Sequence, residues 1–139
     1  MIKAKGVMAE SSSSDLKSFS FDRREPRVND VVIDILYCGI CHSDIHSARN
    51  EWSGTHYPFV PGHEIIGRIT TVGSEISKFK IGDLVGVGCL VDSCRHCNSC
   101  SDGLEQYCDN GFTGTYNSED KIGGTSHAYT LGGYSDKIT

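Results

Sequence analysis

Four closely spaced cysteines constrain what this 139-residue chain can fold into more than any other feature. They lie in "CRHCNSCSDGLEQYC" with the spacing C-x2-C-x2-C-x7-C, at Cys94, Cys97, Cys100 and Cys108. Zinc takes four tetrahedral thiolate ligands, and cysteines two residues apart can chelate one ion while the backbone turns between them. A disulfide framework and an iron–sulfur cluster are the alternatives. The pattern favours structural zinc, because four thiolates fill the coordination shell and leave no open position.

The segment around these cysteines, about residues 92–110, is polar and is predicted to be a loop-like lobe. It has little apolar side chain to bury, so metal binding must supply its folding free energy, on the order of 10 kcal/mol in small zinc modules. The rest of the chain holds most of the 16 glycines and the 3 prolines. This composition favours short strands joined by tight turns. The sequence therefore predicts a mainly β fold with a zinc lobe.

Several segments carry strand signals. The run "DVVIDILYC" (30–38) is rich in β-branched residues, and 63–74, 80–90 and the C-terminal 127–139 show weaker strand patterns. Glycines at 67, 86 and 88 inside these patterns indicate a strongly curved sheet. Residues 1–30 predict an irregular β lead-in. Between the strands, Ser43 or Asp44 can cap a short helix that places His42 and His46 on one face.

Charge and hydropathy exclude several classes of protein. The chain has 13 basic and 18 acidic residues, a net charge of −5, so we expect no nucleic-acid partner. We find neither a secretory signal nor a run of ~20 apolar residues, and we expect a soluble, cytoplasmic protein with no membrane contact. In such a compartment the seven cysteines stay reduced. Clustered reduced cysteines favour metal over disulfides.

A second metal site is suggested by "YCGICHSDIHS" (37–47) and "PGHE" (61–64). Cys41 and His63 can begin a zinc site of the three-ligand type that leaves a position for water or substrate, and Glu64 can be an extra or exchanging ligand. Asp44 is the residue type that accepts the other ring N–H of a histidine ligand. The alternative is that Cys41 fills the core and that Gly-His-Glu begins an ordinary strand. Cys38 and Cys89 lie in apolar runs and are expected to be buried thiols.

The segments "YCGICHSDIHS", "NEWSGTHYPFVPGHEIIGRI", "GDLVGVGCLVDSCRHCNSC" and "TYNSED…GGYSDKI" together resemble zinc-dependent medium-chain alcohol dehydrogenases. The chain is most similar to the branch that contains the cinnamyl alcohol dehydrogenases, which reduces aldehydes with NADPH. The resemblance is dense from about residue 25 to the end. It implies a GroES-like partial β-barrel with short helices and a four-cysteine zinc lobe, which agrees with the strand and glycine patterns.

The resemblance also implies site residues. It makes Cys41 and His63 ligands of a catalytic zinc, with Glu64 beside the metal, and it makes the four cysteines of the lobe ligands of a structural zinc. The Cys2His catalytic zinc of alcohol dehydrogenase is a standard example of this coordination.

The remaining roles follow from the same resemblance. Ser43 is expected to hydrogen-bond the substrate oxygen, His46 to pass the proton to solvent, and His42 to approach the cofactor pyrophosphate. Trp52 is expected to line the substrate pocket, with plain core packing as the alternative. The substrates implied are primary alcohols and aldehydes, and the cofactors are Zn2+ and NADP(H).

Some features of the family have no counterpart in residues 1–139. We expect residues 1–139 to be the catalytic domain alone, without the family's Rossmann domain or its third zinc ligand, and the isolated chain to be inactive. The alternative is a non-enzymatic zinc-binding GroES-like module that acts through protein contacts. The sequence leaves open the physiological substrate, the choice between NAD and NADP, and the oligomeric state, although the family forms homo-oligomers.

Overall fold

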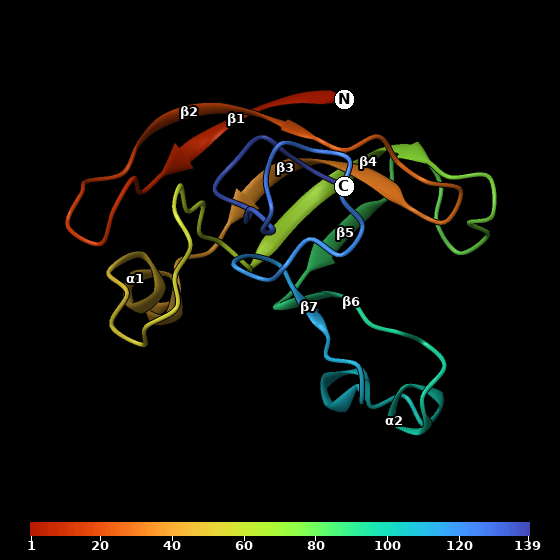
Figure 1. The fold of residues 1–139 in the computed structure, drawn as a ribbon. Coiled ribbons are helices and arrows are strands. Elements are labelled where there is room, and N and C mark those ends of the chain that lie inside the picture. Colours follow the sequence, from red (N-terminus) through yellow and green to blue (C-terminus); the bar gives the residue numbers. More distant parts are fainter.

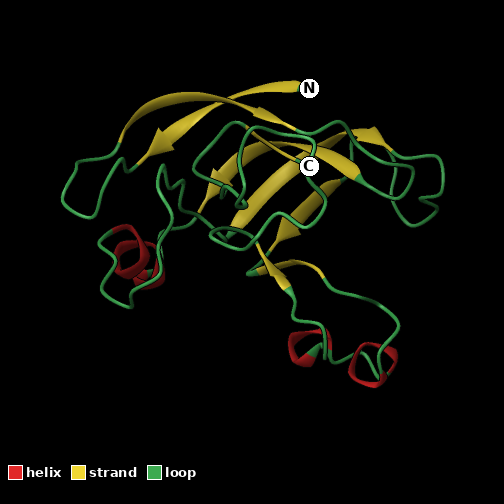
Figure 2. Cartoon of the chain, in the orientation of Figure 1, coloured by secondary structure: helices red, strands yellow, loops and turns green.

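A computed structural model describes all 139 residues and shows three small antiparallel sheets with few helices (Figures 1 and 2). The first sheet pairs β1 (Ile2–Met8) with β2 (Lys17–Arg23). The central sheet has the order β5-β4-β3-β8, formed by Leu84–Val87, Ile65–Val72, Val31–Cys38 and Lys137–Ile138. The third sheet pairs β6 (Leu90–Asp92) with β7 (Thr113–Gly114). The expected mainly β fold is confirmed.

The N-terminal lead-in is more regular than the sequence pattern predicted. β1 and β2 form one uninterrupted ladder, from Ile2 opposite Arg23 to Met8 opposite Lys17. In β2, Phe19 and Phe21 point to one side and stack at 5.5 Å, while serines alternate with them. This two-residue period buries the aromatic face, which is the usual basis of a half-buried strand.

The central sheet is irregular where the sequence predicted curvature. The register of β3 against β4 shifts between Val32 and Ile33 and again between Ile35 and Tyr37. Gly67 of β4 lies opposite Ile35, at the second shift. Such shifts bend a strand and increase its twist. The isoleucines of this sheet form one buried cluster, consisting of Ile33, Ile65, Ile69 and Ile138.

The C-terminal segment joins the hairpin to the central sheet. Its backbone at Tyr134 and Asp136 bonds to β1, and the carbonyl of Asp136 also accepts the N–H of Ile35 in β3. The strand pattern at 127–139 corresponds to a strand only at its end, where Lys137–Ile138 pairs. The reason is that one short segment is shared between two sheets, so neither ladder can continue.

Arg23, the last residue of β2, fixes this C-terminal segment. Its side chain is 9% exposed and donates to the carbonyls of Leu131, Gly132 and Lys137 at 2.5, 2.8 and 3.0 Å. A fourth bond, of 2.9 Å, goes to the hydroxyl of Ser135. Burial lowers the pKa of Arg23 to about 10, although the charge of Asp136 opposes the shift. The guanidinium therefore links β2 to the end of the chain.

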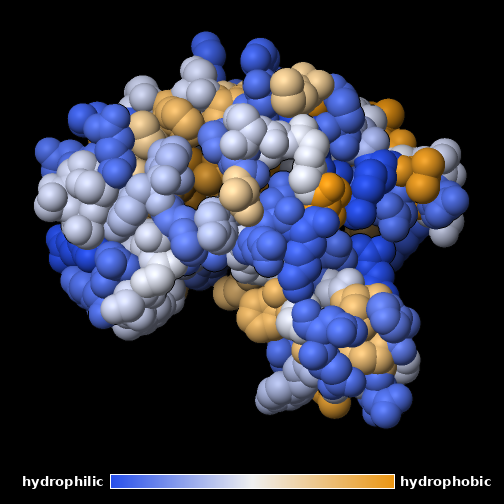
Figure 3. All heavy atoms as spheres, in the orientation of Figure 1, coloured by the Kyte–Doolittle hydropathy of each residue, from blue (hydrophilic) through white to orange (hydrophobic).

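The helices are short and lie at the edges of the sheets. The helix α1 (His42–Ala48) follows β3, and α2 (Asn98–Ser101) and the 3-10 helix η1 (Glu105–Tyr107) lie within the lobe, which was predicted to be a loop. The lobe projects from the body of the molecule (Figure 3). No helix has the length and apolar character required to span a bilayer.

Candidate metal centres

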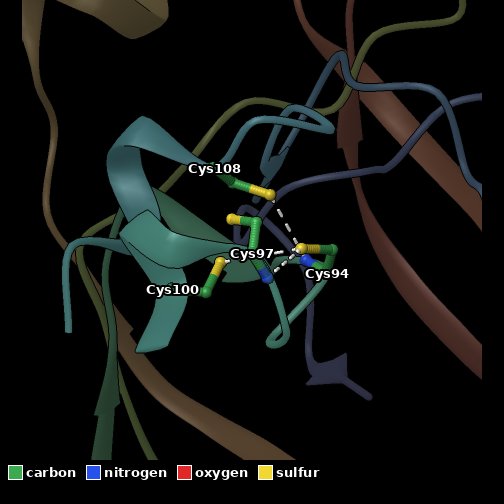
Figure 4. A group of neighbouring side chains, drawn as sticks. All are labelled: Cys94, Cys97, Cys100 and Cys108. Atoms are coloured by element: carbon green, nitrogen blue, oxygen red, sulfur yellow. Dashed lines mark hydrogen bonds between the residues drawn. The ribbon is translucent and has the colours of Figure 1, made fainter. Parts of the chain in front are cut away.

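The four cysteines of the lobe bring their sulfur atoms together. Cys94 lies in the loop after β6, Cys97 caps α2, Cys100 lies in α2, and Cys108 ends η1. The sulfurs point toward a common centre (Figure 4), and all four lie within 4.8 Å of one another. The sulfurs of Cys94 and Cys100 are 3.9 Å apart. A zinc tetrahedron with arms near 2.3 Å has edges of about 3.8 Å, so the spacing fits this ion.

Backbone amides stabilise the thiolates of the cluster. The N–H groups of Cys97, Cys94 and Asp109 donate to sulfurs of the cluster at 3.4, 3.5 and 3.5 Å. Backbone hydrogen bonding at His96, with further contacts, lowers the pKa of Cys94 to about 5. Cys100 behaves in the opposite way: its bond with Ser93 would lower the pKa, but burial and the neighbouring thiols raise it to about 11. All four groups can therefore be thiolates together only when a cation lies between them.

The lobe has almost no core apart from these sulfurs. Cys100 and Cys108 are its only buried residues between 92 and 110, whereas Leu104 and Tyr107 are exposed. A segment with so little apolar burial cannot offset its conformational entropy unless something else binds it together. The donor set and the lack of a core both fit a structural zinc ion held by four cysteines.

The second group consists of Cys41, His63 and Glu64, whose ligand atoms also lie within 4.8 Å of one another. Cys41 is the N-cap of α1, so neither Ser43 nor Asp44 is the cap, as the sequence had suggested. Asp44 occupies the third helical position and closes a capping box by accepting the N–H of Cys41. The cap was misassigned because a cysteine is an unusual N-cap residue.

The turn that carries His63 depends on a glycine. Gly62 has φ of +103°, and a Cβ there would lie 2.6 Å from the Tyr134 ring and 2.8 Å from the sulfur of Cys38. Only glycine tolerates both the conformation and the close contact. His63 then points inward and is 8% exposed, while Glu64 faces solvent at the start of β4.

Asp44 connects three separate segments around this group. Its side chain is 3% exposed, and its carboxylate accepts from the N–H of Cys41 at 2.9 Å, the N–H of Gly62 at 2.9 Å and the hydroxyl of Tyr134 at 3.2 Å. Burial, with the negative charge of Asp44 beside it, raises the pKa of Tyr134. The carboxylate therefore fixes the position of the Cys41 backbone relative to the turn that presents His63.

The Nδ1 atom of His63 has two polar neighbours. The hydroxyl of Tyr116 lies 3.1 Å away, and Oδ1 of Asp44 lies 3.5 Å away. Burial raises the pKa of Tyr116 to about 12, and a hydrogen bond with Ser47 opposes the shift. Asp44 is thus placed beside His63, as expected, but the tyrosine makes the shorter contact.

The outer face of α1 gathers the remaining residues of interest. The hydroxyl of Ser43 lies 3.5 Å from the sulfur of Cys41. His46 Nδ1 is 2.5 Å from a carboxylate oxygen of Glu51, and its ring lies 4.8 Å from Trp52 and 6.2 Å from His42. Trp52 is 62% exposed, which excludes the alternative that it is a core residue of this chain.

Some residues differ from the prediction or were missed. Cys89 was expected to be a buried thiol and is exposed, because residues 80–90 form two short strands with Cys89 in the link between them, not one strand. Glu51 lies five residues from its partner His46, but no sequence pattern marked it. Tyr116 and Tyr134 carry no spacing signal that relates them to His63 or Asp44, and their contacts arise from the tertiary fold.

Comparison with known proteins places the chain in a family. The alcohol dehydrogenase GroES-like domain family matches residues 27–139. The chain is 56% identical over 139 residues to aldehyde reductase YahK of Escherichia coli, covering 99% of this chain and 38% of the relative. Among solved structures it resembles a cinnamyl alcohol dehydrogenase (SbCAD4) from Sorghum bicolor, with a TM-score of 0.91, 46% identity, and coverage of 99% and 38% of the two chains.

A second solved structure, CAD from Helicobacter pylori complexed with NADP(H), gives a TM-score of 0.92 and 46% identity, with coverage of 99% and 39%. The chain therefore spans under two-fifths of the length of these relatives. The expected GroES-like fold and the resemblance to cinnamyl alcohol dehydrogenases are confirmed. Because the match extends over most of its residues, the chain belongs to the alcohol dehydrogenase GroES-like domain family.

Proposed function

We propose that this chain supplies the zinc-binding, substrate-facing part of an alcohol dehydrogenase that interconverts primary alcohols and aldehydes with NADP(H). The observation that carries the proposal is the convergence of Cys41, His63 and Glu64, with the hydroxyl of Ser43 next to the cysteine sulfur. The names of the relatives, aldehyde reductase and cinnamyl alcohol dehydrogenase, support the same reaction class.

The two metal centres have different roles in this proposal. Cys94, Cys97, Cys100 and Cys108 would hold a structural ion, because their four thiolates leave no position for a substrate. Cys41 and His63, with Glu64 as a further or exchanging ligand, would hold a catalytic ion with an open position. A zinc ion there would supply Lewis-acid polarisation of the substrate oxygen.

The proton would then leave through side chains of α1. Ser43 lies beside the sulfur of Cys41 and would exchange a hydrogen bond with the substrate oxygen. His46 lies one helical turn further, so the two side chains share a face of α1. Glu51 binds Nδ1 of His46 and leaves Nε2 to exchange the proton. A histidine suits this role because its unperturbed pKa of about 6.5 lies near working pH.

The exposed side chains around this path would contact the substrate and the cofactor. Trp52 presents an uncovered aromatic face beside His46, which suits an aromatic aldehyde. His42, exposed at the first position of α1, would meet the cofactor phosphates. The structure bound to NADP(H) among the relatives supports NADP(H) as the cofactor.

Metal content tests the two centres. Elemental analysis of the protein purified without chelator should give two zinc ions per chain. Cys41→Ser and His63→Ala should each give one. Cys97→Ser is the matched control, because it should affect the lobe and leave the Cys41 group intact. A wild-type value near one, unchanged in Cys41→Ser, would contradict the proposed catalytic site.

Activity tests the reaction. In a hybrid enzyme, residues 1–139 replace the matching 38% of the Sorghum bicolor enzyme, and reduction of cinnamaldehyde by NADPH is followed at 340 nm. Ser43→Ala and His46→Gln should each lower kcat by about 10²–10⁴-fold, the usual contribution of a proton-transfer group. A folded hybrid that holds two zinc ions and shows no turnover would instead favour the zinc-binding module that acts through protein contacts.

A further inference from the structure

The Nδ1 side of His63 is enclosed by protein groups, whereas its Nε2 makes no hydrogen bond within the chain. Nδ1 lies 3.1 Å from the hydroxyl of Tyr116 and 3.5 Å from Oδ1 of Asp44, and the imidazole and phenol rings are 5.3 Å apart. A neutral histidine can bind a metal only through the nitrogen that carries no hydrogen. The group that binds Nδ1 therefore decides which nitrogen is free.

The partners of Asp44 indicate where the hydrogen of His63 lies. An ionised carboxylate only accepts hydrogen bonds, so a nitrogen that lies beside it is favoured in the protonated form. The nearer oxygen of Asp44, however, already accepts the N–H of Gly62 at 2.9 Å. The hydroxyl of Tyr116 is closer to Nδ1 and is the better placed acceptor.

Tyr116 is held in place by residues outside the metal group. Its ring packs edge to face against Phe59, with centroids 5.1 Å apart, and Phe59 is almost fully buried. Ser47 of α1 is its other polar neighbour. On either side of Tyr116, the N–H of Thr115 bonds to Cys89 and the N–H of Asn117 to Thr130. The hydroxyl is thus fixed by the fold, before any ligand binds.

We infer that Tyr116 is a positioning residue for the second metal group: its hydroxyl accepts the Nδ1 hydrogen of His63 and keeps Nε2 free to face Cys41 and Glu64. The inference rests on the proposed function, since it assigns the catalytic ion to this group. Removing the hydrogen-bond partner of a metal-binding histidine typically lowers the metal affinity by about 10–100-fold.

The test uses Tyr116→Phe, which keeps the ring and removes only the hydroxyl. Tyr129→Phe is the matched control, because Tyr129 follows on the same segment and stacks on His56, away from the metal group. The first measurement is the tautomer of His63, read from the 15N shifts of its ring in protein loaded with one zinc ion per chain. We expect hydrogen on Nδ1 in the wild type and in Tyr129→Phe, and a shift toward hydrogen on Nε2 in Tyr116→Phe.

The second measurement is the affinity for the second metal equivalent, obtained with Co2+ by competition against a chelator and followed through its visible absorption. We expect Tyr116→Phe to bind about 10–100-fold more weakly than the wild type and Tyr129→Phe to match the wild type. Near-ultraviolet circular dichroism checks that the variants are folded.

The outcomes separate this inference from the proposed function. An unchanged tautomer in Tyr116→Phe overturns the inference, even if affinity falls, because a loosened fold alone would weaken binding. An unchanged affinity overturns it as well. If the wild type binds no second ion, the proposed catalytic site fails, whereas the tautomer measurement still decides how Tyr116 acts on His63.

Discussion

Replacing Arg23 with alanine should destabilise the whole chain, since this side chain satisfies three backbone carbonyls in a buried place. The carbonyl of Leu131 would lose its donor. Those of Gly132 and Lys137 would keep only the hydroxyl of Ser135, at 3.2 and 3.0 Å, which can donate to one of them at a time. A buried polar group left without a partner costs about 1–3 kcal/mol. Two carbonyls are then left without a donor, and water can enter the space that the side chain vacates, so we expect a total loss of about 2–5 kcal/mol. That is a large fraction of the roughly 7–20 kcal/mol expected for a domain of this size.

The loss can be measured by urea unfolding of the zinc-loaded protein at pH 7, followed by far-ultraviolet circular dichroism. Arg68→Ala is the control, because Arg68 also donates to a carbonyl, that of Gly82 at 2.7 Å, but at the exposed surface. It should cost under about 1 kcal/mol. The Arg23 variant should also bind the second metal ion more weakly, because Tyr134 in the fixed segment donates to Asp44. If Arg23→Ala unfolds within 1 kcal/mol of Arg68→Ala, the reasoning is wrong.

Three further predictions concern the lobe, an acidic side chain and the turn at Gly62. Removing metal with a strong chelator should disorder residues 92–110, because the lobe buries only Cys100 and Cys108; limited proteolysis should then cut there first, and an unchanged digestion pattern would contradict this. Burial would raise the pKa of Asp30, but hydrogen bonds from Arg27 and Arg24 outweigh it and hold the pKa well below its usual range. The stabilisation that the ionised Asp30 gives the fold is therefore complete above about pH 4, and it is lost as the pH falls through the pKa of Asp30 in the folded protein. Asp30→Asn should cost about 2 kcal/mol of unfolding free energy at pH 7 and progressively less in acid. A cost that is constant between pH 7 and pH 2 would argue against the ion pairs. In Gly62→Ala the new Cβ would be strained at φ +103° and would clash with Tyr134 and Cys38, so the zinc content should fall from two ions to one while the lobe keeps its ion. Two tightly held ions in this variant would show that the turn can accommodate a side chain.

The sequence was most informative where the interacting residues are close together along the chain. The four-cysteine group lies within 15 residues, and metal geometry links their spacing to a site without any knowledge of the rest of the fold. The strand at 31–38 was also predictable, because β-branched residues dominate it. The resemblance to a known family brought Cys41 and His63 together, a pairing that the residues alone left open.

The contacts that tie distant segments together were not predictable. Tyr116 and Tyr134 lie 53 and 90 residues from His63 and Asp44, their partners. A tyrosine in a glycine-rich stretch fits a surface turn as well as a buried contact, so nothing local marks either one. The regular β1–β2 ladder was missed for a similar reason, since the pairing of two weak strand patterns is decided by the core that they cover.

Because of the carboxylate of Asp44, the two metal groups should become able to bind their ions at different stages of folding. The lobe closes a loop of 15 residues, so it can capture its ion as soon as that stretch of chain exists. The Cys41 and His63 group needs Gly62 and Tyr134 to meet Asp44, and Tyr134 is among the last residues of the chain. Ribosome-bound chains that end before Tyr134 should therefore carry one ion, and the second should arrive only after synthesis has passed that residue. Loading of the second group would thus report that the C-terminal segment has docked onto the rest of the domain.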